Sequence, residues 1–300
     1  MYAIIQKRKY YYTLSLLLLI PGILSMFIWG FKFGIDFTGG SLMRLEFSKN
    51  VPSTQQITEA VKVAEVKNVS IQLTGEKGLS LRLEPITNAQ KEKILSNLKK
   101  FDEKITENSF ETIGPTIGSE LKRKSITAMA IVLILIILYI TWAFRKVSVG
   151  PVPSWIYGVS AIIALVHDMI MVIGIFSIFG HFFGIEIDTL FVTALLTILG
   201  FSVHDTIVVY DRIRERLISS TGKTYEEVVN ESMNQTMVRS INTSMTALLI
   251  LFALVLFGGN TIRNFVLALL IGIASGTYSS IFVASPILVT WNNFRQKKKN

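Results

Sequence analysis

Six long apolar stretches constrain this chain more than any other feature of its 300 residues. A stretch of about 20 apolar residues is long enough to cross the hydrocarbon core of a bilayer as an α-helix. Half of all residues are apolar, and the mean hydropathy of +0.49 agrees with a membrane protein. We therefore predict a polytopic α-helical membrane protein with six transmembrane helices, at residues 11–30, 126–144, 153–179, 189–209, 236–257 and 265–291.

Basic residues flank these stretches and do not form one patch, so the formal charge of +9 does not indicate nucleic-acid binding. They are concentrated at four places that a six-helix topology puts on one side of the membrane. The positive-inside rule makes that side cytoplasmic, and both termini are then predicted to be cytoplasmic. The residues are Lys7, Arg8 and Lys9; Arg145 and Lys146; Arg212, Arg214 and Arg216; and Arg295, Lys297, Lys298 and Lys299.

Three regions follow from this topology. Residues 1–30 are an N-terminal tail and the first helix, which we interpret as an uncleaved anchor because residues 26–33 offer no small-residue cleavage site. Residues 31–124 form an extracytoplasmic domain. Residues 125–300 form a five-helix membrane bundle with a charged, helical cytoplasmic loop at about 211–235.

The extracytoplasmic segment has the pattern of a small α+β domain. Alternating segments at 41–47, 69–73, 79–83 and 109–112 predict strands, and 53–64 and 88–101 predict helices, the first capped by Ser53. The order strand–helix–strand–strand–helix–strand is typical of a ferredoxin-like arrangement.

Asp205 and Arg239 are the strongest candidates for function inside the membrane. A charged side chain in a bilayer costs from about 3 kcal/mol upwards, so it is usually paired, hydrated or involved in ion movement. Both residues are expected in the cytoplasmic half of neighbouring helices. A pair that breaks and reforms would let Asp205 carry a proton, which predicts a proton relay. A static ion pair, or an Arg239 that only reaches for the headgroups, remains the alternative.

Three further ionisable residues, His167, Asp168 and His204, are weaker candidates for the same relay. The repeated His–Asp sequence could instead hold a metal with His181 as a third ligand. The two pairs are expected at different depths on different helices, and the chain has no cysteine, so we predict no metal site. No residue pattern indicates a catalytic centre or a bound cofactor.

Small and hydroxyl residues surround these charges in the fourth, fifth and sixth stretches. Small residues permit close helix packing, and hydroxyls can form hydrogen bonds between helices or line a hydrated proton path. Both interpretations remain open. The residues include Thr193, Thr197, Gly200, Ser202, Asn242, Thr243, Ser244, Thr246, Ser275, Ser279 and Ser280.

Five motifs together resemble the SecD/SecF family of protein-translocase subunits, and the SecF-type branch in particular. They are GIDFTGG at 34–40, ETIGPTIGSEL at 111–121, TILGFSVHDTIVVYDRIR at 197–214, RSINTSMT at 239–246 and the segment 258–286. The motifs occur in the family's order and cover nearly the whole chain. The resemblance identifies Gly34, Asp36, Gly39 and Gly40 as the signature, and possible hinge, that opens the extracytoplasmic domain.

The resemblance also implies a function. The family is a half-transporter of the resistance-nodulation-division type in the bacterial cytoplasmic membrane. It pairs with SecD, assists the SecYEG channel together with other insertion or accessory subunits, and handles unfolded exported polypeptides. The expected activity is translocation driven by the proton gradient, with a sodium gradient as an open alternative, and not enzymatic catalysis. The membrane-embedded acid of the family falls on Asp205 and its arginine on Arg239, while His204 stands where many members have asparagine.

Two other functions share the same helical plan. A proton-driven exporter of small molecules or lipids would need large outer loops around a drug-sized pocket, and this chain has one outer segment of under 100 residues. A purely structural subunit of a membrane complex would not need the charge of Asp205.

Overall fold

The computed structural model describes residues 2–66, 69–144, 150–219 and 222–298. The chain divides into two compact units, one of Met1–Lys32 with Thr127–Asn300 and the other of Phe33–Ile126. We call them the helical unit and the sheet module. Arg145, Lys146 and Lys299, which contributed to the predicted topology, lie outside the described residues.

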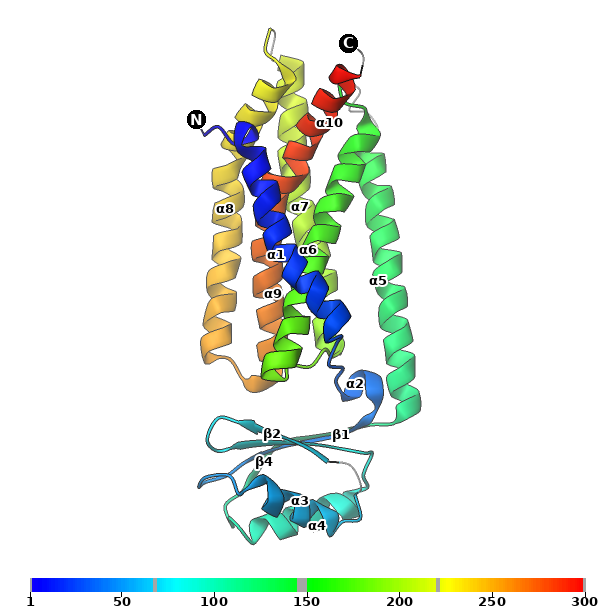
Figure 1. The fold of residues 1–300 in the computed structure, drawn as a ribbon, viewed down its shortest axis with the longest axis vertical. Helices are drawn as coiled ribbons and strands as arrows, with labels where there is room; N and C mark the ends of the chain where they lie inside the picture. Colours follow the sequence, from blue (N-terminus) through cyan, green and yellow to red (C-terminus); the bar gives the residue numbers. More distant parts are fainter. Residues whose placement is uncertain (1, 67–68, 145–149, 220–221, 299–300) are drawn as a thin grey trace. The chain divides into compact units, whose positions relative to one another are not determined.

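Six segments of the described chain are helices long and apolar enough to cross a membrane, as predicted, and the protein is a multi-pass membrane protein. The last span differs from the single regular helix expected at 265–291, because it contains a π-helical turn, η2. Such a turn holds one extra residue and interrupts the regular hydrogen bonding. The spans are α1 (Arg8–Ile28), α5 (Pro115–Ala143), α6 (Ser154–Phe183), α7 (Thr189–Ser219), α8 (Tyr225–Phe257), and α9 (Asn260–Ser279) with η2 (Ser280–Ala284) and α10 (Ser285–Lys297) (Figure 1).

The charged segment predicted at about 211–235 extends two of the membrane helices. Helix α7 continues to Ser219, and α8 begins at Tyr225. Thr224 caps α8 through a capping box, in which its hydroxyl accepts a hydrogen bond from the Glu227 backbone amide. The same helices therefore carry the apolar spans and the charged extensions.

Helix α9 lies at the centre of the helical unit, packed against α6, α7 and α8, while α1 packs on α6. Two glycines allow the crossing of α1 and α6: a Cβ added at Gly174 would lie 2.7 Å from the Gly22 Cα atom. One turn further on, the Ser25 and Ser177 hydroxyls share a hydrogen bond of 2.7 Å. This close crossing of small residues is typical of helix packing in membranes, where burial of apolar surface alone does not hold helices together.

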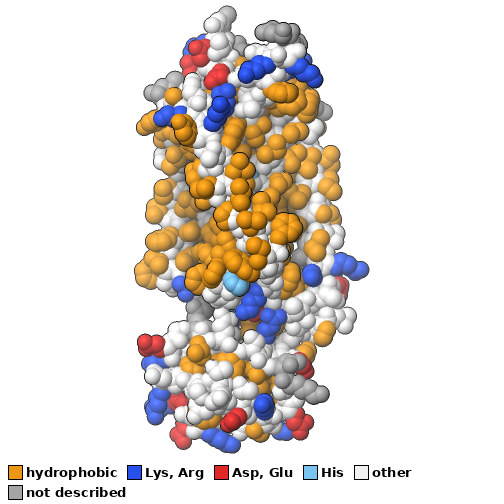
Figure 2. All heavy atoms as spheres, viewed as in Figure 1, with side chains coloured by type: hydrophobic (Ala, Val, Ile, Leu, Met, Phe, Trp, Pro, Cys, Tyr) orange, Lys and Arg blue, Asp and Glu red, His pale blue; other side chains and the backbone are white. Residues whose placement is uncertain are grey.

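The surface of the helical unit is apolar over most of the face on which α1 lies (Figure 2). Helix α5 is the least buried of the six spans, because only 6% of its most apolar segment is buried within the chain. A long apolar helix with so few contacts is stable only in lipid or against another membrane protein. The chain therefore has the surface of a bilayer protein and not that of a water-soluble bundle.

The sheet module contains one antiparallel four-stranded sheet in the order β2-β3-β1-β4. Helices α3 and α4 lie together on one face of it (Figure 1), and Ser53 caps α3 as predicted. The apolar side chains of the strands and the two helices, Met43, Leu81, Ile57 and Ile94 among them, form one buried core. The elements are α2 (Ile35–Thr38), β1 (Gly40–Glu46), α3 (Thr54–Lys62), β2 (Val69–Thr74), β3 (Gly78–Leu83), α4 (Asn88–Lys99) and β4 (Thr106–Ile113).

A buried carboxylate, Asp102, joins two loops of the sheet module. It accepts hydrogen bonds from the Ser48 backbone amide at 2.7 Å and hydroxyl at 2.8 Å, and from the Lys49 and Lys104 amides at 3.2 and 3.0 Å. Burial acts to raise the pKa of this carboxyl, but the hydrogen bonds outweigh it and lower the pKa to about 2. The stabilisation is therefore present above the unfolded pKa of about 3.9 and is lost as the pH falls through the folded value.

We expect the Asp102→Asn variant to lose hydrogen-exchange protection at the Ser48, Lys49 and Lys104 amides at neutral pH, because one carboxylate oxygen becomes a donor. The full chain in detergent, corrected for intrinsic exchange rates, provides the measurement. The wild type should lose the same protection only near pH 2. The exposed neighbour Glu103, replaced by glutamine, is the matched control. Unchanged protection in Asp102→Asn would show that the loops are held by other contacts.

Candidate functional site

Two carboxylates are buried within the helical unit. Asp168 on α6 is 1% exposed, and Asp205 on α7 is 4% exposed. Both helices are long apolar spans, so each carboxyl group lies in a region where a charge needs compensation. Their surroundings differ, and the difference separates their possible roles.

Asp168 has a complete set of hydrogen-bond donors. The hydroxyls of Ser202, Ser275 and Ser279 donate to its carboxylate at 2.7, 2.8 and 2.7 Å. The Nδ1 atom of the adjacent His167 lies 3.0 Å from Oδ1. With a proton on Nδ1, the carboxylate accepts four hydrogen bonds, the number that an ionised carboxylate readily accepts. Because the serines come from α7 and α9, this one side chain ties three helices together.

Asp205 is less well satisfied. Its polar neighbours are Ser240 and Ser244 of α8. Its Oδ2 atom and the Ser240 hydroxyl are nevertheless both buried without a hydrogen-bond partner among the described residues. Ser244 is held from the other side by the Thr277 hydroxyl of α9 at 2.6 Å. A buried carboxyl oxygen without a donor is costly, so Asp205 lies in a site that a proton or a helix movement can stabilise.

Arg239 does not form the expected pair with Asp205 in this structure. Its side chain is exposed on α8 and has no hydrogen-bond or ion-pair partner in the part of the chain that the structure describes. The next residue, Ser240, is the one that lies beside Asp205. Asp205 and Arg239 thus lie at matching depth. Because adjacent residues on a helix point about 100° apart, Ser240 faces Asp205 whereas Arg239 points away from it. The proton relay itself stays a prediction.

The remaining candidates lie apart from one another. His204 is exposed on α7, and it ends a stripe of exposed residues that also contains Thr193, Thr197 and Gly200. These positions recur at helical spacing, so they share one face of α7. Helix α8, which packs against α7, exposes a second polar set. Its members are Arg239, Asn242, Thr243 and Thr246.

The signature glycines lie in the sheet module, at the join of α2 and β1. Gly39 and Gly40 have φ angles of +72° and +130°, which only glycine adopts without strain. A Cβ at Gly39 would lie 2.9 Å from the Pro115 Cα atom, and one at Gly118 would lie 2.9 Å from the Gly39 nitrogen. The two family-like motifs therefore meet at this junction.

The other two signature residues flank the same short helix. Gly34 caps the start of α2, and Asp36 occupies its first turn. The signature is thus a tight backbone junction.

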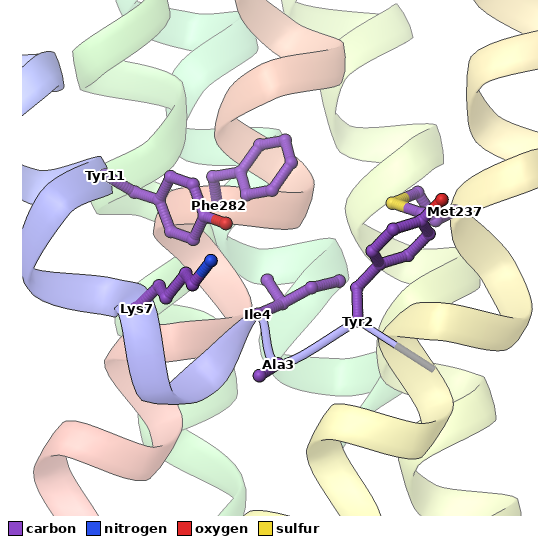
Figure 3. Close-up of a pocket in the computed structure, with 7 residues that line it drawn as sticks. All are labelled: Tyr2, Ala3, Ile4, Lys7, Tyr11, Met237 and Phe282. Carbon is purple, nitrogen blue, oxygen red and sulfur yellow. The ribbon is translucent and has the colours of Figure 1, made fainter.

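Among the described residues of the helical unit, two hollows are relevant to the site. One, of about 260 Å³, lies beside the N-terminal segment and is lined by Tyr2, Ala3, Ile4, Lys7, Tyr11, Met237 and Phe282; Figure 3 shows Lys7 extending toward Tyr11 and Phe282. The second is an apolar groove of about 610 Å³ between α1, α6 and the last span, with His167 in its wall. The first has a single charged side chain and suggests packing rather than chemistry.

The N-terminal segment is fixed by side chains of α8. The Asn230 carboxamide oxygen accepts hydrogen bonds from the Ile4 and Ile5 amides at 2.9 and 3.2 Å, and its NH₂ donates to the Tyr2 carbonyl at 3.1 Å. Glu226 binds both Arg8 at 3.2 Å and Asn293 at 3.3 Å. The start of α1, the start of α8 and the end of α10 therefore meet at one end of the helical unit.

Sequence reasoning did not identify the donors to Asp168. From the sequence alone, Ser202, Ser275 and Ser279 are only small, hydroxyl-bearing residues near the charges. A usable signal existed: Ser275 and Ser279 are four residues apart and share one face of α9, as two donors to a single carboxylate must.

Comparisons with known proteins give a consistent result. The family described as "Protein export membrane protein SecD/SecF, C-terminal" matches residues 93–294, and the "SecD/SecF GG Motif" matches residues 24–51. A protein translocase subunit SecF from Thermobaculum terrenum is 46% identical over 97% of this chain and 94% of its own length. A SecDF subunit from Thermus thermophilus is 37% identical over 96% of this chain but only 38% of its own length.

A solved structure is also similar. The crystal structure of the Thermus SecDF, described as a translocon-associated membrane protein, superimposes with a TM-score of 0.83 at 36% identity. The match covers 97% of this chain and 39% of that chain. The likeness therefore extends over both the helical unit and the sheet module.

Proposed function

This chain belongs to the SecD/SecF family of protein-export membrane proteins, as an accessory subunit of the Sec protein translocase, and from that premise we propose that it converts proton movement through its buried carboxyl layer into export of unfolded polypeptides. The layer of Asp168, Asp205 and their hydroxyl neighbours supports the proposal most directly. Asp168 has donors that explain a structural role, but Asp205 has a buried carboxyl oxygen without a donor among the described residues, which a purely structural bundle does not require.

A SecD-type subunit is the proposed partner. In the Thermus relative, named SecDF, a segment like this chain is part of a much longer protein. The exposed polar stripe of α7 and the polar residues of α8 would be unfavourable against lipid, because hydroxyl and charged groups in hydrocarbon need partners. A second helical unit covering this face would satisfy them and would enclose Asp205 between two subunits.

Proton movement at Asp205 supplies the proposed driving force. One elementary charge crossing a membrane potential gains about 2.3 kcal/mol per 100 mV, which is enough to bias a helix rearrangement. Protonation removes the charge of Asp205, and deprotonation restores the need for donors. A rotation of α8 by about 100° would replace Ser240 with Arg239 beside the carboxylate. Arg239 would then take the predicted role of charge partner in one stage of the cycle.

The sheet module is the proposed grip on the exported chain. Its strand order and its alternation of strands and helices support a ferredoxin-like domain, which the proposed topology places outside the cytoplasm. Helix movement would reach it through α5 and the glycine junction. The proposed location is the bacterial cytoplasmic membrane with both termini in the cytoplasm, beside the SecYEG channel. A small-molecule exporter is not favoured, because the relatives are named as translocase subunits.

Export of a secreted precursor tests the function. Cells depleted of their own subunit should recover late-stage export when this chain is expressed with its SecD-type partner, and the gain should vanish when the proton gradient is dissipated with ATP maintained. If rescue persists without the gradient, the chain is a scaffold and not a motor.

The partner face can be tested in the same cells. Because the chain has no cysteine, Thr197→Cys introduces a unique thiol on the polar stripe, and it should crosslink to SecD. Leu17→Cys, on the apolar face and 66% exposed, is the control and should not. Equal crosslinking at both positions would reject the assigned face.

A further inference from the structure

We propose that His167 and Asp168 form a second proton-binding site, and that the Nε2 atom of His167 is the atom that takes up and releases the proton. The inference deepens the proposed proton-driven function and rests on it. It starts from a contact: His167 Nδ1 lies 3.0 Å from the Asp168 carboxylate, and both side chains are at least nine-tenths buried.

The hydrogen bonds assign the protons. The Asp168 carboxylate accepts hydrogen bonds from three hydroxyls, and an ionised carboxylate has no proton to donate, so the proposal places a proton on His167 Nδ1. Its Nε2 atom then carries a free lone pair, and this atom is buried and has no hydrogen-bond partner among the described residues. A neutral imidazole that donates from one nitrogen and presents a bare second nitrogen is a proton acceptor.

The groove beside His167 runs toward one end of the bundle. His167 lies near the middle of α6 and in the wall of the groove between α1, α6 and the last span. The groove also contains Tyr12, Thr290 and Phe294, which lie toward the bundle end where Arg8, Glu226 and Asn293 meet. The Tyr12 and Thr290 hydroxyl oxygens are 3.1 Å apart. In the proposed topology this end is cytoplasmic, so the dyad would exchange protons with the cytoplasm.

Few other groups compete for the proton. The titratable side chains that face His167 are Asp168 on its own helix, Tyr12 on α1 and Tyr278 on α9, whose ring stacks at 6.2 Å. None of the described residues that line the groove is an acid, a lysine or an arginine. Uptake of one proton from the aqueous phase by Nε2 changes the dyad from a net charge of −1 to a neutral imidazolium–carboxylate pair. Release returns that proton to water.

Helix α9 connects this event to Asp205. Its Ser275 and Ser279 hydroxyls hold the Asp168 carboxylate, whereas Thr277 contacts Ser244, a neighbour of Asp205. A change in the charge of the dyad changes the hydrogen bonds on one face of α9, while the other face borders the Asp205 site. The π-helical turn follows at once, at Ser280–Ala284, where the helix is least regular.

Nitrogen NMR of histidine side chains tests the site directly, because the chain has only three histidines. The full chain would be labelled with imidazole ¹⁵N, assembled with an unlabelled SecD-type partner in bilayers and titrated. His167→Asn assigns the signal by its loss. We expect a neutral, Nδ1-protonated His167 that converts to imidazolium as the pH falls. In Asp168→Asn the conversion should occur at a different pH, because the anion beside Nδ1 is gone.

The controls separate this site from the general function. His181→Gln, at the far end of α6 and stacked on Trp29, should leave the His167 titration and export unchanged. A His167 that stays neutral wherever the protein is folded, or titrates identically in Asp168→Asn, overturns the inference. Because NMR reads protonation and not export, a normal titration in a chain that fails the export test would reject the proposed function alone.

Discussion

Replacing Asp205 with asparagine is expected to reduce export to the level of cells that lack the chain. Asparagine keeps the shape of the side chain and removes its proton chemistry, so the site of Asp205 between α7 and α8 would remain packed, but residue 205 could no longer change charge. Pulse-chase export of a secreted precursor at matched membrane levels provides the measurement. Copurification with the SecD-type partner shows that the variant still assembles.

Asp211→Asn is the matched control for this variant. Asp211 lies on the same helix six residues further on, and its exposed side chain is paired, among the described residues, with Arg214 at 3.5 Å. Exposed pairs of this kind contribute little to stability, so export should stay near the wild-type level. Full export with Asp205→Asn would refute the proton relay and leave the chain as a structural subunit.

The second large effect is expected at Gly40. Its φ of +130° is unfavourable for any residue with a side chain, and an added Cβ would lie 2.7 Å from the Leu83 carbonyl oxygen, inside the sheet. Strained backbone of this kind costs about 1–3 kcal/mol, and the steric conflict with a backbone atom adds to it. Gly40→Ala should therefore destabilise the first strand and expose the sheet module to protease.

Limited proteolysis in membranes, read alongside export, measures this effect. Gly114→Ala is the control, because Gly114 lies in the same junction but has open space where its Cβ would go. A Gly40→Ala protein that resists protease and supports export would show that the strand can shift to accommodate the methyl group. Glycine would then not be required at position 40 for the strand to form.

Much of the fold was predictable because it depends on periodic patterns. The six spans follow from the length of apolar runs, and the α3 cap follows from Ser53 and the residues after it. The π-helical turn in the last span was not predictable, since segment 280–284 reads as ordinary apolar helix. It depends on how that span packs against α6 and α7.

The candidate site was only partly predictable for a geometric reason. The sequence places Asp205 and Arg239 at matching depth, but packing between the helices determines the rotation of each helix about its axis, and therefore the direction of each side chain. Small residues allow several packing arrangements, so the direction of Arg239 could not be read from spacing. The same ambiguity concealed the importance of Asp168, whose donors come from residues 34, 107 and 111 positions away.

The hydrogen bonds between Asn230 and the N-terminal segment also determine when this segment can be fixed during synthesis. The Ile4 amide donates to Asn230, which is synthesised 226 residues later. At translation rates of about 5–20 residues per second, that interval is roughly 10–45 s. Helix α1 can pack on α6 earlier, but its N-terminal start is among the last parts of the chain to be fixed, and until α8 is made this start is accessible to chaperones, insertion factors and proteases.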